Sequence, residues 1–292
     1  MQKQVKHLSQ QYYFNPLFFY FSLKGDLLKK TDHGAEFSNA KKNCILILSN
    51  NIALVTINGM LNCWDLDAET CINRIKINID VTCMLNFLNK YIIMGSNNGK
   101  LSVFNCASFK LVKQINAHSG HFPINSVIFY ENDMFISCSH DNLIKIWSID
   151  SNNCLRVINN SYGSNCLILS KDKERLICGG NSGNIRIWNI INGSFIKNIN
   201  ASGSLYLFEI TNDNRLICAE KSGLIKIWNL FDYKFEKVLK CHLKRIETLK
   251  VINENELITY SQRDGTLKHW NLDIDKCVKS FNVSGTDCSE FF

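Results

Sequence analysis

The sequence predicts an all-β fold built from a four-stranded unit that repeats about every 41 residues. The five tryptophans are separated by gaps of 83, 41, 40 and 42 residues, and Phe104 divides the first gap into 40 and 43. Each of these aromatic residues ends a similar short phrase, such as LIKIW at Trp147. A second apolar run precedes each phrase, and a tight polar turn separates the two. Regular spacing of this kind indicates repeated structure.

The second and third strands of each repeat are expected to form a hairpin. The phrases LNCW, LSVF, LIKIW, IRIW and LKHW alternate apolar with polar residues, the period of a strand with one buried face. Runs such as MFISCS, RLICGG and ELITYS precede them. The turns between the two strands include Asn98-Gly99, Asp141-Asn142 and Asp264-Gly265, which are typical hairpin turns.

A first and a fourth strand flank each hairpin. Candidate first strands are INSVIFY at 124–130, NCLILS at 165–170 and IETLKV at 246–251. Candidate fourth strands follow the aromatic residue, as in CINRIKI, CLRVI and CVKSF. Each repeat is therefore expected to contain four strands.

This pattern resembles the WD40 repeat family, whose members form β-propellers. In that family a His, a Ser or Thr, an Asp and the Trp form a hydrogen-bonded structural tetrad in each blade. Repeats three and six match it with His118, Ser137, Asp141 and Trp147, and with His242, Thr259, Asp264 and Trp270. Repeats four and five depart from it, because Cys178 and Cys218 replace the Ser or Thr, and Ser182 and Ser222 replace the Asp. We expect the tetrads of these two repeats not to form.

The repeats assign the whole chain, 1–292, to a single propeller. Their approximate boundaries are 40–78, 79–116, 117–160, 161–200, 201–240 and 241–282. One seventh of the chain length is close to the repeat spacing, and the phrase around Phe21 resembles a third strand. We therefore expect seven blades, the seventh being a composite of 1–39 and 283–292 in which N-terminal strands pair with a C-terminal strand. Six blades is the alternative.

Composition excludes several classes of protein. The net charge of +7 is small for 292 residues and its basic doublets are dispersed, which argues against nucleic-acid binding. No apolar run approaches the roughly 20 residues of a membrane-spanning helix. The 13 cysteines form no CxxC pair and no metal-spaced cluster with histidine. Scattered cysteines of this kind are typical of a reducing compartment, so we expect a cytoplasmic protein, with the nucleus as the alternative.

No catalytic motif stands out. The sequence contains no GxSxG, GxxxxGK[ST], GxGxxG or HExxH, so we expect no enzyme, no cofactor and no metal site. His118 and His242 are explained by the tetrads. An enzyme with a site in the propeller channel stays open as a minor alternative.

The resemblance places recognition on the top face, formed by the hairpins and by the loops that lead into the first strands. Loops on a rigid scaffold often carry binding residues, and aromatic and Arg side chains are enriched in binding hot spots. The candidate partner-binding residues on this face are Phe122, His140, Tyr162, Tyr206, Lys221, Arg245 and Arg263.

The predicted function is a non-catalytic scaffold or adaptor that docks protein or peptide partners on the top face. Acidic or phosphorylated segments would suit Arg245 and Arg263, since Arg pairs bidentately with such groups. The alternative is a substrate-receptor subunit of a ubiquitin ligase complex. The sequence before residue 40 is too short for an F-box, and no Trp is followed by Arg three residues later, so we favour the scaffold.

Overall fold

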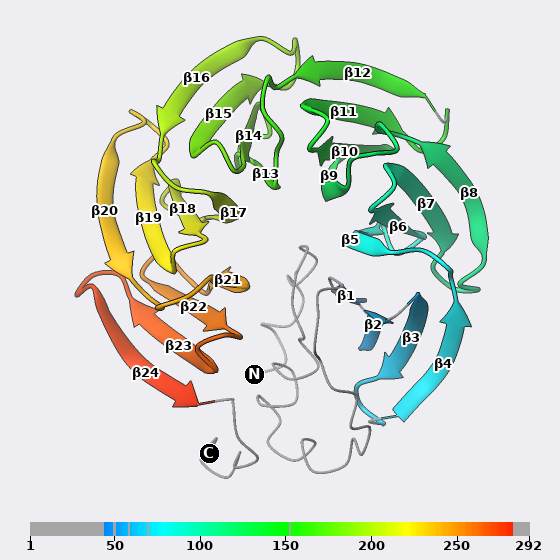
Figure 1. Cartoon of the computed structure of the whole chain (residues 1–292), viewed down its shortest axis with the longest axis horizontal. Helices are drawn as coiled ribbons and strands as arrows, with labels where there is room; N and C mark the ends of the chain where they lie inside the picture. The colour runs from blue at the N-terminus through cyan, green and yellow to red at the C-terminus, as the bar shows by residue number, and fades with distance from the viewer. Residues whose placement is uncertain (1–43, 49–50, 58, 69, 152, 283–292) are drawn as a thin grey trace. The chain divides into compact units, whose positions relative to one another are not determined.

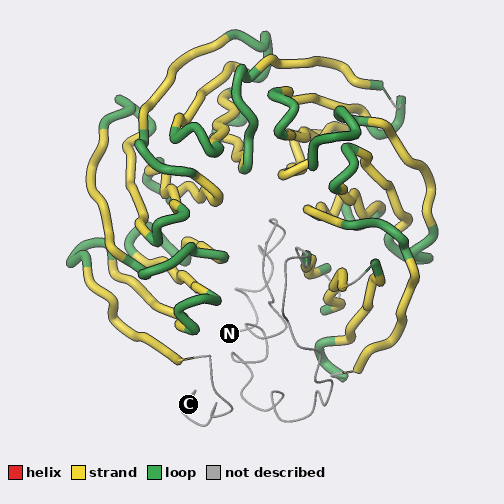
Figure 2. The backbone as a smooth tube through the Cα atoms, in the orientation of Figure 1, coloured by secondary structure: helices red, strands yellow, loops and turns green. Residues whose placement is uncertain are grey.

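The computed structural model describes residues 44–282, apart from 49–50, 58, 69 and 152. In this part of the chain 24 strands form six sheets of four strands each. Strands pair in chain order within each sheet, so every sheet is an antiparallel meander (Figures 1 and 2). We call the sheets blades 1 to 6.

The described residues fall into two compact units that divide after Phe129. The first unit contains blades 1 and 2. Their strands are β1 Ile45–Ile47, β2 Ile52–Ile57, β3 Met60–Asp65, β4 Thr70–Lys76, β5 Val81–Phe87, β6 Tyr91–Ser96, β7 Lys100–Asn105 and β8 Leu111–Asn116.

Blade 3 begins with β9, which spans the division between the units. Its strands are β9 Ile124–Glu131, β10 Met134–Ser139, β11 Leu143–Ser148 and β12 Cys154–Asn159.

The second unit continues with blades 4 to 6. Their strands are β13 Cys166–Leu169, β14 Arg175–Gly179, β15 Asn184–Asn189, β16 Phe195–Asn200, β17 Leu205–Ile210, β18 Arg215–Glu220, β19 Leu224–Asn229, β20 Phe235–Lys240, β21 Thr248–Val251, β22 Glu256–Ser261, β23 Thr266–Asn271 and β24 Lys276–Asn282.

Consecutive blades stand beside one another through their first strands. In the second unit β13 lies next to β17, and β17 lies next to β21, while β16, β20 and β24 form the outer edge (Figure 1). In the first unit β1 lies next to β5. This is the blade architecture of a β-propeller, and it confirms the expected all-β fold of repeated four-stranded units.

The hydrophobic core lies between consecutive blades. One cluster joins blades 4 and 5 and includes Ile187, Leu216 and Trp228, and another joins blades 5 and 6 and includes Ile227 and Trp270. Because both faces of each sheet are covered, the second strands are buried almost throughout, whereas the fourth strands are largely exposed. Each fully buried Ile or Leu side chain contributes about 1.5–3 kcal/mol, which fixes the blades that position the top face.

The blade count differs from the expected one. The described residues form six blades, the alternative number, and not seven. The residues of the expected composite blade, 1–39 and 283–292, lie outside the described residues. The hairpin strands match the sequence pattern closely, since MFISCS is β10, and the first strands β13 and β21 are shorter than expected.

Candidate functional site on the top face of the second unit

The top face of the second unit is built by the alternation of connections in each meander. Hairpins between second and third strands lie at the same edge of the blades as the loops that lead into first strands. The hairpins there span residues 140–142, 180–183, 221–223 and 262–265. A glycine with positive φ ends three of these turns, Gly183 at 72°, Gly223 at 87° and Gly265 at 64°. A Cβ at Gly223 would lie 2.2 Å from the His242 carbonyl oxygen.

Blade 6 carries a continuous polar network beneath its hairpin. Nε2 of His242 lies 2.8 Å from Oγ1 of Thr259, and Nε1 of Trp270 donates to the same hydroxyl oxygen at 3.0 Å. Nδ1 of His242 lies 3.3 Å from Oδ2 of Asp264, whose carboxylate also accepts the backbone N–H of Leu243 at 2.8 Å. Burial, with Lys268 nearby, lowers the pKa of His242 to about 4 in spite of Asp264. The ring is therefore neutral at pH 7, and the network fixes the loop that leads into β21.

Blade 3 shows part of the corresponding arrangement. Trp147 Nε1 donates to Ser137 Oγ at 2.9 Å, and Asp141 Oδ1 accepts the backbone N–H of Leu143 at 3.0 Å across the hairpin. His118 is buried in the first unit, on the other side of the division between the units.

Blade 4 uses an asparagine one position before the histidine of the repeat pattern, since Asn160 follows β12 directly as Cys241 follows β20. Oδ1 of buried Asn160 accepts the Trp188 indole N–H at 3.0 Å and the Cys178 thiol at 3.1 Å. Burial raises the pKa of Cys178 to about 12, so the thiol keeps its proton and acts as a donor. The Asn160 amide group donates to Ser164 Oγ at 3.0 Å and to the Tyr162 carbonyl oxygen at 2.9 Å. A different set of residues thus links strand and loop in this blade.

Blade 5 lacks a side-chain acceptor for its tryptophan among the described residues. Ala201 occupies the loop before β17, and Trp228 Nε1 is buried without a hydrogen-bond partner among the described residues. A buried ion pair holds this hairpin instead. Lys226 Nζ lies 2.6 Å from Glu220 Oε1, and Ser222 Oγ donates to Glu220 Oε2 at 2.9 Å.

Side-chain contacts run across the top face from blade 3 to blade 5. His140 Nε2 lies 2.7 Å from Oδ1 of Asn165, whose amide group donates to Asn181 Oδ1 at 2.9 Å and to the Leu205 carbonyl oxygen at 3.0 Å. Tyr206 Oη donates to the same Asn181 oxygen at 3.2 Å. These bonds fix the positions of His140 and Tyr206.

An aromatic and cationic cluster continues these contacts into blade 6. The Arg245 guanidinium stacks over the Tyr206 ring, 4.0 Å from its centroid. Burial raises the pKa of the neighbouring Glu247, although the Gln262 backbone N–H, at 2.9 Å, and the charges of Arg245 and Arg263 oppose the rise. We call Tyr206, Arg245, Glu247 and Arg263 the arginine cluster. A guanidinium held over a ring in this way is pre-ordered for contact with a partner.

Three further binding residues expected from the sequence are not members of the arginine cluster. Tyr162 is exposed and receives the Arg186 guanidinium at 4.6 Å from its ring centroid. Lys221 is exposed on the hairpin of blade 5. Phe122 is 41% exposed and belongs to the first unit.

Three residues of the site were missed in the sequence. Asn181 stands directly before a hairpin turn, at the position of His140 in blade 3 and Lys221 in blade 5, so the repeat register could have identified it. Asn165 and Glu247 are less conspicuous, because their role depends on contacts between neighbouring blades.

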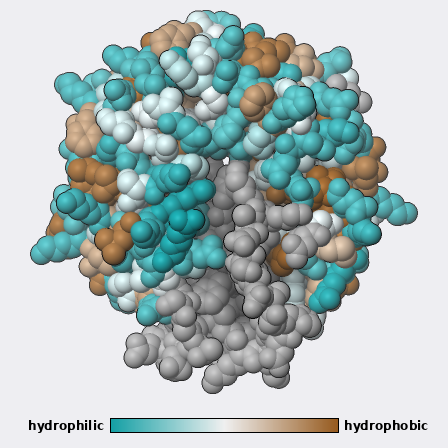
Figure 3. Space-filling model, in the orientation of Figure 1, coloured by the Kyte–Doolittle hydropathy of each residue, from teal (hydrophilic) through white to brown (hydrophobic). Residues whose placement is uncertain are grey.

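The surface of the described residues is mostly polar. Figure 3 shows a face on which hydrophilic side chains predominate and apolar ones are scattered. Among the residues that the structure describes, no group of three or more His, Cys, Asp or Glu residues could hold a metal ion. No helix in the same part of the chain is long and apolar enough to cross a membrane.

Comparison with known proteins identifies the repeat. The WD40 family, described as "WD domain, G-beta repeat", matches residues 109–148 and 152–189. Each match runs from the fourth strand of one blade to the third strand of the next, so the sequence repeat links neighbouring blades.

Several curated proteins are similar over about half of this chain. Autophagy-related protein 16 of Arabidopsis thaliana is 21% identical over 143 residues, 48% of this chain and 28% of that protein. The CCR4-associated factor 4 homolog of Vanderwaltozyma polyspora is 30% identical over 148 residues, 49% of this chain and 18% of that protein. Human apoptotic protease-activating factor 1 is 27% identical over 169 residues, which are 58% of this chain and 13% of that protein. The match therefore spans well under half the length of each relative.

Proposed function

Since the chain carries WD40 repeats, we propose that it is a non-catalytic scaffold that docks a protein or peptide partner on the top face of its second unit. The arginine cluster carries this proposal. It combines an Arg stacked on a Tyr with a second Arg, and these residue types dominate the energetics of protein interfaces. One relative, the CCR4-associated factor 4 homolog, is itself named for an association with another protein.

The partner segment proposed for this cluster is acidic or phosphorylated. Arg245 and Arg263 both favour the charged form of the Glu247 carboxylate, although burial raises the pKa of Glu247 on balance. A carboxylate or phosphate from a partner can form charge-assisted, bidentate hydrogen bonds with the same guanidinium groups. The tight contacts from His140 to Tyr206 hold the platform in place, which reduces the entropy lost on binding.

We place the protein in the cytoplasm, with the nucleus as the alternative. The scattered cysteines of the sequence support a reducing compartment, and immunofluorescence of the tagged full chain would test it.

A quantitative pull-down from native lysate tests the docking function. Wild type is compared with Arg245→Ala/Arg263→Ala and with Lys173→Ala/Lys234→Ala, which removes the same charge from exposed loops at the opposite edge of the blades. We expect specific partners to be lost from the first variant alone. Treating the lysate with phosphatase distinguishes the two kinds of partner. Binding of a phosphorylated partner is lost after the treatment, whereas binding of an acidic partner is retained. Equal recovery by all three proteins would contradict the proposed site.

A further inference from the structure

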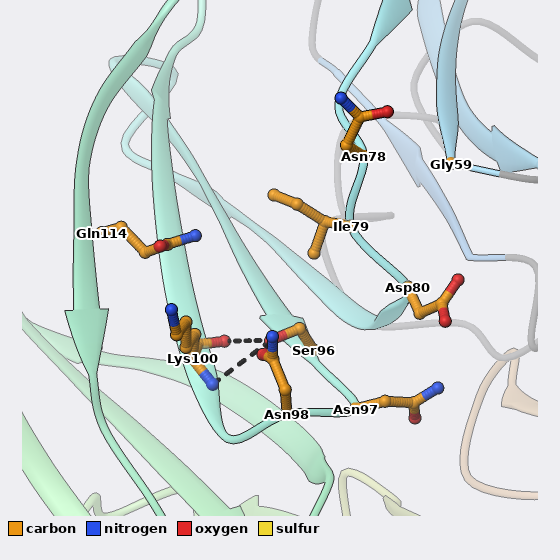
Figure 4. Close-up of a pocket in the computed structure, with 9 residues that line it drawn as sticks. All are labelled: Gly59, Asn78, Ile79, Asp80, Ser96, Asn97, Asn98, Lys100 and Gln114. Carbon is orange, nitrogen blue, oxygen red and sulfur yellow. Dashed lines mark hydrogen bonds between the residues drawn. The ribbon is translucent and has the colours of Figure 1, made fainter. Parts of the chain in front are cut away.

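A polar groove of about 550 Å³ opens between blades 1 and 2, within the first unit (Figure 4). It begins at Gly59 in the hairpin of blade 1 and crosses the segment between β4 and β5. It then reaches the hairpin and fourth strand of blade 2. The residues that line it are Gly59, Asn78, Ile79, Asp80, Ser96, Asn97, Asn98, Lys100 and Gln114.

Blade 2 lacks a long basic side chain that, in blades 4 to 6, reaches the loop before the first strand. The third strands of those blades carry Arg186, Lys226 and Lys268 in register with Cys178, Cys218 and Thr259. Each of these basic side chains donates a hydrogen bond to a carbonyl oxygen of the loop before the first strand, as Lys268 Nζ does to the Cys241 oxygen at 2.8 Å.

In blade 2 the same position is Ser102, in register with Met94. The short Ser102 side chain cannot reach the loop. Its hydroxyl oxygen accepts a hydrogen bond from Nε2 of Gln114 at 3.1 Å. Gln114 belongs to the outer strand β8 and lines the groove.

The loop residue opposite is also released from its usual role. The backbone N–H of Asn78 donates to the Gly59 carbonyl oxygen at 3.2 Å, as that of His242 donates to Gly223 at 3.0 Å. Asn78 therefore occupies the loop position that holds the tetrad histidine in blade 6. In blade 6 the Thr259 hydroxyl bonds both to His242 and to the Trp270 indole N–H. Blade 2 has Met94 and Phe104 at the positions of Thr259 and Trp270, and neither side chain can form such a hydrogen bond with Asn78. Asn78 is exposed in the groove (Figure 4).

The lining restricts the chemistry of a ligand. The described residues place no aromatic side chain along the groove, so they offer no stacking surface for a nucleobase. One cation, Lys100, is matched by one anion, Asp80, which does not suit a polyanion. The volume of the groove is similar to that of small-molecule pockets, but its lining is more polar than the largely apolar lining of such pockets.

Side-chain amides are the feature that remains. Asn78, Asn97 and Gln114 each present a carbonyl acceptor and an amide donor, the two groups that a peptide bond also carries. Main-chain groups of an extended polypeptide can pair with such amides irrespective of its side chains, and Lys100 provides one position for an acidic residue.

We infer that the groove between blades 1 and 2 binds an extended polar peptide segment of a partner protein, mainly through the partner's main chain. This site goes beyond the proposed docking on the second unit, because it uses other residues and another kind of recognition. It gives the scaffold a second attachment point.

The probe is a phage-displayed library of random linear heptapeptides, selected on the full chain. Enriched peptides are synthesised and their affinities measured by calorimetry for wild type, Asn97→Ala, Ser102→Lys and the control Lys110→Ala, an exposed residue of the loop between β7 and β8. Asn97→Ala removes one amide from an exposed hairpin position, and Ser102→Lys introduces beside the groove the lysine that blades 5 and 6 carry at this position.

We expect Asn97→Ala to weaken binding about fivefold, as the loss of one hydrogen bond predicts, and Ser102→Lys to abolish it. N-methylation of a contacted peptide N–H is expected to weaken binding by a similar factor, whereas Lys110→Ala has no effect. The inference is overturned if no peptide is enriched, if Asn97→Ala binds as wild type does, or if N-methylation is without effect.

Arg245→Ala separates this inference from the proposed function. Peptides that lose affinity with Arg245→Ala and keep it with Asn97→Ala bind the arginine cluster, which would support the proposed function and refute the groove. Peptides with the opposite behaviour support the groove.

Discussion

The histidine of blade 6 makes the stability of the second unit depend on pH. The His242 side chain is enclosed between Thr259, Asp264 and Lys268, and its pKa is lowered to about 4 from 6.5, chiefly by burial. Above pH 6.5 the ring is neutral in the folded and the unfolded chain. As the pH falls from 6.5 toward 4 the unfolded chain binds a proton first, so the stability that depends on neutral His242 is lost over this window.

The size of the effect follows from the shift of the pKa. A difference of one pKa unit between the two states corresponds to about 1.4 kcal/mol. The pKa of His242 is lowered by about 2.5 units on folding. At pH 4.5 the unfolded chain is almost fully protonated at this residue, whereas most of the folded chain is still unprotonated. The free energy of unfolding is therefore lower by about 2.5 kcal/mol at pH 4.5 than at neutral pH. The His242→Gln variant has no group at this position that titrates in the window, so it should not show this loss.

Urea denaturation at pH 7.5 and pH 4.5 measures the effect. We expect wild type to lose about 2.5 kcal/mol more than His242→Gln between the two pH values, whatever the carboxylates contribute to both. His121→Gln, which removes an exposed histidine, should behave as wild type. Equal pH dependence of wild type and His242→Gln would refute the assignment of the neutral ring.

Two further predictions concern the blades without a matching tetrad. Cys218→Thr places a hydroxyl in blade 5 where Thr259 accepts the indole N–H in blade 6, so we expect it to stabilise the protein by about 1 kcal/mol in urea denaturation. Amides of β18 and β19 should exchange with solvent faster than those of β22 and β23, and Cys218→Thr should narrow the difference; unchanged exchange would contradict the role given to Trp228. Asn160→Ala leaves the Trp188 indole N–H without its acceptor and should destabilise the protein by about 1–3 kcal/mol by thermal and urea unfolding, whereas exposed Asn153→Ala should have no effect. A loss as small as that of the control would mean that the Asn160 network does not stabilise blade 4.

Much of the fold follows from the sequence because the repeat is carried by local patterns. The alternating phrases and hairpin turns locate the second and third strands, since strand period and turn residues act over short distances. First strands such as β13 are shorter than the sequence pattern predicts. Their ends depend on hydrogen bonds with the neighbouring blade, such as the one from the Asn165 side chain to the Leu205 carbonyl oxygen, and a local pattern does not contain this information.

The site could be predicted only in part. His140, Tyr206, Arg245 and Arg263 follow from the repeat register, which assigns them to the top face. The Asn160 network could not be anticipated from the repeat pattern, because Asn160 lies one position before the pattern's histidine and its amide oxygen accepts both the indole N–H and the thiol. The groove of the first unit depends on what Ser102 lacks relative to three other blades, which is apparent only when the strand registers are compared.

The central claim is that a partner binds the top face of the second unit, and site-specific photo-crosslinking tests it most directly. A photoreactive residue is placed at Lys221 or Gln262 on the top face, and at Lys173 or Lys234 on loops at the opposite edge; all four positions are exposed. We predict that partners from native lysate crosslink to the first two positions, and that Arg245→Ala removes these crosslinks. Crosslinks that form only from Lys173 and Lys234, or that persist in Arg245→Ala, would contradict the account.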